Sequence, residues 1–212
     1  MIVNYAFRGC SSLTSVSIGN SVTSIGTSAF TNCNNLIFIS VESNNLNYTS
    51  ENGVLFNKSK TMLVQYPISK TDARYILPSS VTTIGESAFR NCRYLTSVEI
   101  SKNVKTIETN AFAGCSGLTS VKISNCITII EYATFYNCSN LTSVKIPNSV
   151  ITIGDYAFAG CSGLTFVKIS NSVKTIGDYA FGNCGLTDVK IPKSVKTIGK
   201  GVFDDYPTSG TR

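Results

Sequence analysis

Histidine is absent from this 212-residue sequence, and tryptophan is absent too. Without histidine the chain has no Ser-His or Cys-His nucleophile and no histidine-ligated metal centre. Charged residues make up only 14%, and the 18 basic residues exceed the 12 acidic ones by too little to indicate nucleic-acid binding. No apolar run approaches the roughly 18 residues of a membrane span. Met1 to Ser12 also lack the basic region and apolar core of a secretion signal.

Internal repetition is what the sequence has in abundance. One frame of 23 residues recurs along the chain, most fully from Phe135 to Phe158. After each phenylalanine from Phe7 to Phe158 a leucine stands six residues on, Val or Ile nine on, and a further aliphatic residue two beyond that. After Phe181 the frame is one residue short, which a deletion in the loop Cys184-Gly185 accounts for. The phenylalanines that define the frame are Phe7, Phe30, Phe89, Phe112, Phe135, Phe158, Phe181 and Phe203. So many coincidences at one spacing predict a stack of similar coils.

Each unit combines a strand pattern with a turn pattern. Leu-x-x-Val-x-Ile alternates with period two, which predicts a short strand with one buried face. Ala-Phe-x-x-Cys places two apolar residues three apart, which predicts one turn of α- or 3₁₀-helix. Gly or Asn precedes each of these cysteines, and both tolerate the left-handed backbone that ends such a turn. Glu86, Asp155 and Asp178 follow the glycine before this turn, and we expect them to cap it.

The predicted fold class is a repeat solenoid. A unit of 23 residues cannot bury its own apolar side, whereas stacked units bury it in continuous ladders. Strands of neighbouring units would then pair in parallel, about 4.8 Å apart, and make one long sheet. We therefore expect residues 1–205 to form a single array and residues 206–212 a polar tail. The chain opens inside a unit without a polar cap, so we expect a segment of a longer protein or an end covered by another molecule.

One coil of the array is enlarged. Phe30 and Phe89 stand 59 residues apart, 13 more than two periods, and the frame is lost over about residues 42–76. Within this stretch two apolar runs, Val54–Phe56 and Met62–Val64, flank a polar link, which predicts a β-hairpin. The stretch is not rich enough in Pro, Gly or Ser to be an interdomain linker.

Seven cysteines share one place in the frame: Cys10, Cys33, Cys92, Cys115, Cys138, Cys161 and Cys184. Zinc sites use close pairs such as C-x-x-C, and this sequence has none, so no metal site is expected. Neighbouring rungs are close enough for disulfides, but seven rungs cannot all pair. We expect buried free thiols that fill space beside phenylalanine. Cys126 lies instead at a loop position, where we expect an exposed thiol, either incidental or reactive.

The out-facing positions of the predicted strands carry the candidate binding residues. One row contains Ser17, Ser40, Glu99, Lys122, Lys145, Lys168 and Lys190, and the row beside it contains Ser15, Phe38, Ser97, Ser120, Ser143, Phe166 and Asp188. Lysines stacked ~5 Å apart in water repel by roughly 0.8 kcal/mol per pair, so folding gains nothing from them. A basic stripe suits an anionic partner, and exposed aromatic residues favour contact sites. The alternative is that the lysines only maintain solubility.

Lys105, Lys174 and Lys196 form a second, partial row, which we expect on the other side of the coil.

The motif Ile-Pro-x-Ser-Val-x-x-Ile-Gly-x-x-Ala-Phe-x-x-Cys-x-x-Leu-x-x-Val, fullest from Ile146 to Val167, resembles the BspA-like or Treponema pallidum-type leucine-rich repeat. The segment Asn52–Lys58 and the later Tyr66-Pro67 resemble a variant coil of that family. Glu108 and Glu131 replace the usual glycine, and Thr134 replaces the alanine before phenylalanine. The resemblance implies a right-handed leucine-rich-repeat coil.

The resemblance also implies a surface or secreted protein that adheres to host matrix proteins, cells or glycans, with no catalytic residue and no cofactor. Our leading hypothesis is a non-enzymatic binding module that uses the exposed sheet face. Its candidate residues are Lys122, Lys145, Lys168, Lys190, Ser97, Ser120, Ser143, Phe166 and Phe38. The alternative hypothesis is a structural spacer that associates end to end with other copies. Neither hypothesis requires nucleic acid or a membrane span.

Overall fold

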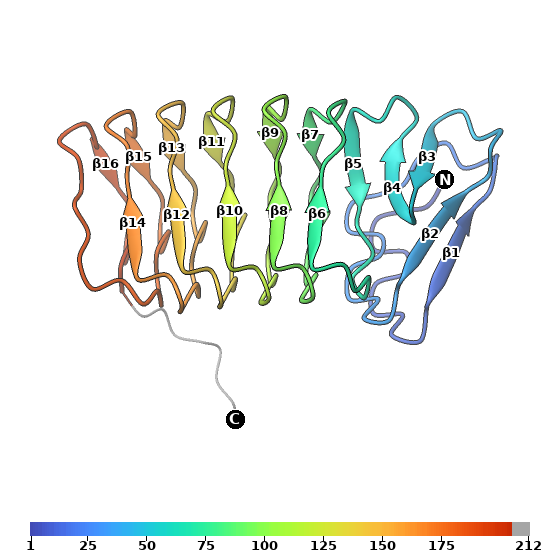
Figure 1. Ribbon diagram of the computed structural model, residues 1–212, viewed down its shortest axis with the longest axis horizontal. Coiled ribbons are helices and arrows are strands. Elements are labelled where there is room, and N and C mark those ends of the chain that lie inside the picture. The colour runs from blue at the N-terminus through green and yellow to red at the C-terminus, as the bar shows by residue number, and fades with distance from the viewer. Residues whose placement is uncertain (205–212) are drawn as a thin grey trace.

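The computed structural model describes residues 1–204, which form a solenoid of about eight coils (Figure 1). Within these residues the chain has sixteen strands of two to four residues and no helix. The expected polar tail, residues 206–212, lies outside the described residues. We name each coil by its phenylalanine, so that the Phe135 coil begins at Phe135.

The alternating segments form strands along one face of the solenoid, as predicted. These strands are β1 (Ser15–Ile18), β2 (Phe38–Val41), β6 (Arg74–Ile76), β8 (Ser97–Glu99), β10 (Ser120–Lys122), β12 (Ser143–Lys145) and β14 (Phe166–Lys168). Strand β1 pairs in parallel with β2, and β6, β8, β10, β12 and β14 form a five-stranded parallel sheet that we call the main sheet (Figure 1). Val98, Val121, Val144 and Val167 all point into the core, so one face of β8, β10, β12 and β14 is buried.

A second set of short parallel strands runs along the solenoid. These strands are β7 (Thr83–Ile84), β9 (Thr106–Ile107), β11 (Ile129–Ile130), β13 (Thr152–Ile153), β15 (Thr175–Ile176) and β16 (Thr197–Ile198). They pair as β7 with β9 and as β11, β13, β15 and β16 in order. The sequence pattern predicted only one sheet, because two residues are too few to show an alternation.

The predicted helical turn is wrong. Cys138 N does donate to Phe135 O at 3.2 Å, as in a 3₁₀ turn. However, the residues two before and two after the phenylalanine, Ala133 and Asn137, have φ of 50° and 55°, which stops a right-handed helix from propagating. Instead, alternate amides donate to the next coil, and Phe135 N lies 2.8 Å from Ala157 O. The left-handed backbone expected before each cysteine is confirmed at Asn137.

The predicted capping role of the acidic residues changes for the same reason. Asp155 Oδ1 accepts from the amide of Asp178 at 2.8 Å, and Asp178 Oδ1 accepts from the amide of Lys200 at 2.7 Å. Glu86 donates its own amide to Glu108 Oε2 at 2.8 Å. These bonds join neighbouring coils, because there is no helical turn to cap.

Aromatic rings stack in two files through the core, Phe7 with Phe30 and Tyr66 through Phe203. Neighbouring phenylalanine rings stack with centroids between 4.9 Å (Phe89–Phe112) and 5.8 Å (Phe181–Phe203). In the enlarged coil Tyr66 takes the place of phenylalanine, with its ring 5.2 Å from that of Phe89. Its hydroxyl donates to Asp72 Oδ2 at 3.0 Å. The repeat frame is therefore restored at Tyr66. The sequence pattern had placed this point later, at Leu77.

The enlarged coil contains the predicted hairpin and one strand more. β4 (Val54–Asn57) pairs antiparallel with β5 (Met62–Gln65), and β3 (Tyr48–Glu51) pairs antiparallel with β4. Asn52 and Gly53 join β3 to β4 with φ of 50° and 81°, a turn that suits these two residue types. Leu55 packs in a smaller core with the first two coils, while other β4 side chains pack in the main core. Strand β4 thus separates two hydrophobic cores.

The cysteines are free thiols, as predicted. Five of the seven ladder cysteines are buried, Cys184 is half-buried and Cys10 is exposed. The thiols also have a role that packing alone did not indicate. Five of the seven ladder cysteines, all except Cys10 and Cys92, donate Sγ to the phenylalanine carbonyl of the preceding coil, and Cys92 Sγ donates to Tyr66 O. In Cys115, for example, Sγ lies 2.9 Å from Phe89 O. Burial raises the pKa of Cys115 to about 12, so this thiol keeps its proton at neutral pH.

Candidate interaction surface

The main sheet presents its candidate residues in register. The Cα atoms of Ser120 and Ser143 are partners in the ladder, as are those of Ser143 and Phe166 and those of Lys145 and Lys168. The out-facing side chains of β10, β12 and β14 are exposed, and Phe166 leaves 59% of its surface accessible. The strand positions expected to face outward are therefore exposed on these three strands, and their role in binding stays a prediction.

The lysines on this face lack carboxylate partners. Within residues 1–204 the ion pairs are Lys60–Glu51, Lys70–Asp72 and Arg74–Glu99. Glu99 is the ladder partner of Lys122 but is bound by Arg74 from the other neighbouring strand. The hydroxyls of Ser120 and Ser143 likewise form no hydrogen bond within the described residues. The face thus offers ammonium and hydroxyl donors that no other group within residues 1–204 uses.

Two predicted residues lie away from this group. Lys190 is exposed, but the segment around it forms no strand, so it does not continue the paired ladder. The sequence frame is one residue short in this segment, beside Gly185. Phe38 lies on β2, in a different sheet, and its ring covers the hairpin turn, where a Cβ on Gly53 would lie 2.6 Å from Phe38 Cδ2. Phe38 and Phe166 therefore do not form one contact site.

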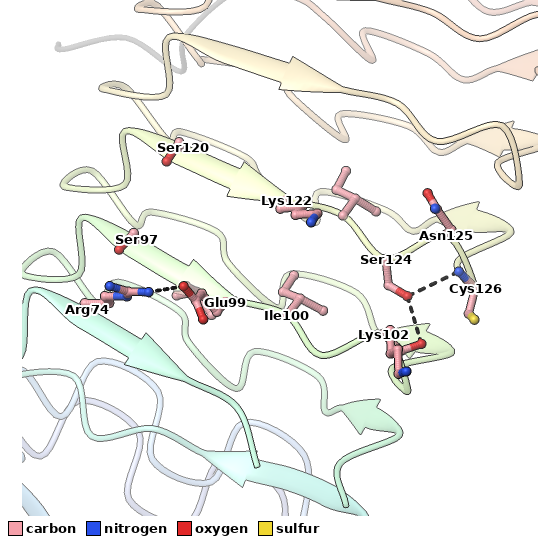
Figure 2. A pocket seen from close by; sticks show the side chains of 12 residues that line it. Arg74, Ser97, Glu99, Ile100, Lys102, Ser120, Lys122, Ser124, Asn125 and Cys126 are labelled. Carbon is pink, nitrogen blue, oxygen red and sulfur yellow. Dashed lines mark hydrogen bonds and ion pairs between the residues drawn. The ribbon is translucent and has the colours of Figure 1, made fainter. Parts of the chain in front are cut away.

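A hollow of about 620 Å³ lies over β8 and β10, where the strands run into their following turns. Figure 2 shows the joined side chains of Arg74 and Glu99 on one side of it and the turn from Ser124 to Cys126 on the other. Lys102 and Lys122 line it together with the apolar side chains of Ile100 and Ile123. Its volume is in the range of small-ligand sites, so it can receive a side chain or a sugar ring of a partner.

Sequence reasoning missed four polar residues of this hollow: Arg74, Lys102, Ser124 and Asn125. A signal existed for Arg74, which stands 23 residues before Ser97 and is its ladder partner. The enlarged coil hid that spacing. Lys102 and Asn125 lie on turns, and nothing in the sequence shows that these turns flank the sheet face.

Cys126 lies at the edge of the hollow and is exposed, as predicted, with its amide donating to Ser124 Oγ at 3.2 Å. A reactive role for it stays a prediction. Within residues 1–204 no three metal-ligating side chains come together. The second lysine row, Lys105, Lys174 and Lys196, lies beside β9, β15 and β16, away from the main sheet.

Comparison with known proteins identifies the repeat. The model for the BspA type leucine rich repeat region matches residues 1–69, 68–163 and 128–209, with six copies. The chain belongs to this family. BspA-type repeats form a protein-interaction fold that is generally non-enzymatic. None of the curated proteins compared with the chain matches it.

Several solved structures share this architecture. A leucine rich cell surface protein from Faecalibacterium prausnitzii is 33% identical, with a TM-score of 0.81 over 100% of this chain and 52% of its own. A leucine-rich repeat protein from Eubacterium ventriosum is 30% identical, with a TM-score of 0.80 over 100% of this chain and 65% of its own. The pneumococcal vaccine antigen PcpA is 25% identical, with a TM-score of 0.70 over 88% of this chain and 51% of its own.

This BspA-type chain thus spans between about half and two thirds of the length of these structures. No helix in the described part of the chain has the length and apolar character to span a membrane.

Proposed function

We propose that this BspA-type array is a non-enzymatic adhesion module that binds an acidic segment of another protein through the main sheet. The observation that carries the proposal is the row of Lys122, Lys145 and Lys168, exposed and without counter-ions within residues 1–204. Like charges at one-strand intervals disfavour the folded state slightly, whereas an acidic partner gains from each of them.

The contact would combine this charge with the apolar surface beside it. Phe166 adjoins Ser143 in the sheet and offers an exposed ring, and the hollow near Lys102 receives one partner side chain. Exposed aromatic residues supply much of the binding energy at protein interfaces. Affinity then comes from many weak contacts spread over neighbouring coils, as is usual for a solenoid face.

The proposal places the module at a cell surface or outside the cell. Two similar structures, a leucine rich cell surface protein and a pneumococcal vaccine antigen, support this location. The partner would be a protein of the host matrix or of a neighbouring cell. A glycan partner is the alternative, and the binding experiment described next distinguishes the two.

The test compares two triple variants in a binding array of matrix proteins and acidic glycans. In the first variant Lys122, Lys145 and Lys168 become Ser, and in the second, the control, Lys105, Lys174 and Lys196 become Ser. Both lose three positive charges, but only the first changes the main sheet. We expect the first variant to lose binding and the second to keep it, with wild-type binding weakening as salt rises.

Equal binding by the two variants, with both folded, would contradict the proposed surface. A glycan that binds through the same lysines would keep the surface but replace the protein partner. The alternative of end-to-end association stays a prediction, and sedimentation of the wild-type protein over a range of concentrations tests it.

A further inference from the structure

The enlarged coil interrupts a hydrogen-bond pattern that elsewhere joins each coil to the next. In every regular coil three alternate amides around the phenylalanine donate to carbonyls of the following coil, as Phe89 N does to Ala111 O at 2.8 Å. The equivalent amides of Ser28, Phe30 and Asn32 form no hydrogen bond within residues 1–204. The coil that follows them runs here as the extended strand β5, so its carbonyls are not in the places that a regular turn would give them.

A cleft therefore separates the turn of the Phe30 coil from the turn of the Phe89 coil. Only side chains span it: the hydroxyls of Ser28 and Ser87 lie 3.2 Å apart, and Asn91 Nδ2 donates to Asn32 Oδ1 at 3.0 Å. Two cavities of about 190 and 110 Å³ lie along the cleft, and Ser28 and Glu86 line both. Of the residues with unpaired amides, Ser28 lines both cavities and Phe30 lines the smaller one.

The larger cavity has more donors than acceptors. Arg8, Arg90 and Thr31 line it, and neither arginine belongs to an ion pair within residues 1–204. Arg90 Nε and Thr31 Oγ1 are both buried without a hydrogen-bond partner in this part of the chain. One end of the Arg90 guanidinium is fixed, since its Nη1 donates to Asn110 Oδ1 at 3.0 Å.

Glu86 supplies the one carboxylate among the residues that line the larger cavity. Burial and then the neighbouring Glu108 raise the pKa of its carboxyl, and no cation counteracts them. Glu86 is therefore not the counter-ion of either arginine. The wall of this cavity retains one net positive charge in addition to its unpaired donors.

We propose that this cleft binds a small oxyanion, of the phosphate, sulfate or carboxylate class, held by Arg90, Arg8, Thr31 and the free amide of Ser28. A guanidinium presents a fork of donors that matches such an anion, and the unpaired amide of Ser28, which lines the same cavity, adds a backbone donor. The cavity has a volume of 190 Å³, equal to about six water molecules in the liquid, so an oxyanion fits with some of its hydration. This site is on the turn side of the solenoid and does not depend on the function proposed for the main sheet.

Calorimetric titration of the whole chain with inorganic phosphate, sulfate and acetate, at constant ionic strength, tests the proposal. We expect saturable binding of at least one anion. Arg90→Gln and Thr31→Val should each weaken it, Arg90→Gln by roughly tenfold or more, since a hydrogen bond to a charged group is lost. Glu86→Gln should strengthen binding, because it removes a negative charge from the wall.

Arg93→Gln is the matched control. It removes the same charge from an exposed side chain that packs over Tyr94, outside the cleft. Binding that responds to Arg90, Thr31 and Glu86 but not to Arg93 supports the site, and the preferred anion identifies its class. Absence of saturable binding to all three anions, or an equal loss in Arg90→Gln and Arg93→Gln, overturns it. If Arg90→Gln does not fold, the opposite effects expected for Thr31→Val and Glu86→Gln decide the question.

Discussion

Replacing Phe135 by alanine tests whether stability is distributed along the stack of coils. The Phe135 ring is fully buried, with its centroid 5.4 Å from that of Phe112 and 5.2 Å from that of Phe158. Its removal leaves a cavity between two rings that the neighbouring coils hold apart. Phenylalanine-to-alanine changes in cores cost about 3–5 kcal/mol, which for a chain of this size lowers the melting temperature by about 6–20 °C.

The same change at Phe7 should cost clearly less. Phe7 is only half-buried, and within residues 1–204 it stacks on one phenylalanine, Phe30, at 5.4 Å. In a linear array each coil contacts only its neighbours, so a terminal coil can fray without unfolding the rest. Urea denaturation followed by circular dichroism gives both losses, and hydrogen exchange shows which coils open.

A globular core would give a different result. Equal losses of stability at Phe135 and Phe7, with exchange protection lost uniformly along the chain, would refute the one-dimensional account of stability. A broadened transition in Phe135→Ala, with protection retained in distant coils, would support it.

Three other expectations concern the thiols and the enlarged coil. A colorimetric thiol reagent should modify Cys10 and Cys126 rapidly in the native protein and the five buried thiols only in urea; rapid reaction of all eight would contradict the burial. Alkaline pH should destabilise the fold. Above pH 9 thiols of the unfolded chain lose their protons, whereas Cys115 in the folded chain keeps its proton up to about pH 12. The urea midpoint should therefore fall between pH 9 and pH 12, and it should fall less in Cys115→Ala. Tyr66→Phe should cost about 1 kcal/mol, through the lost hydrogen bond to Asp72, without changing the ring stack; an unchanged urea midpoint would show that this bond contributes nothing.

The spacing of identical residue types predicted the coil, the buried faces of the strands and the hairpin. The spacing did not predict the turn around each phenylalanine, because its left-handed backbone is adopted by residue types that do not usually favour it. Residues two before the phenylalanine, such as Ala133 and Tyr156, have φ of 50° and 56°. Because neither alanine nor tyrosine is a typical left-handed residue, the turn resembled a helix in the sequence. Asn137 marked the second left-handed position because asparagine tolerates it.

The candidate surface was predictable only within the regular coils. Lys122, Lys145 and Lys168 occupy strand positions whose direction follows from alternation alone. Arg74 occupies the same kind of position, but the enlarged coil precedes it and Tyr66 replaces the phenylalanine that would have shown the frame. The hollow depends on where the turns at Lys102 and Asn125 lie relative to the sheet, a tertiary property without a sequence pattern.

The two proposed sites arise from opposite properties of a repeated chain. Repetition of one out-facing position places lysines side by side on the main sheet, so its contacts are many and similar. Interruption of the repeat leaves the amides of Ser28, Phe30 and Asn32 without carbonyls. A buried polar group without a partner costs about 1–3 kcal/mol, so this interruption opposes folding unless another acceptor is present. The unpaired amides are donors, and Arg90 Nε and Thr31 Oγ1 are also buried without a partner within residues 1–204, so a bound anion offsets this cost. Added phosphate should therefore raise the melting temperature of the wild-type chain more than that of Arg90→Gln.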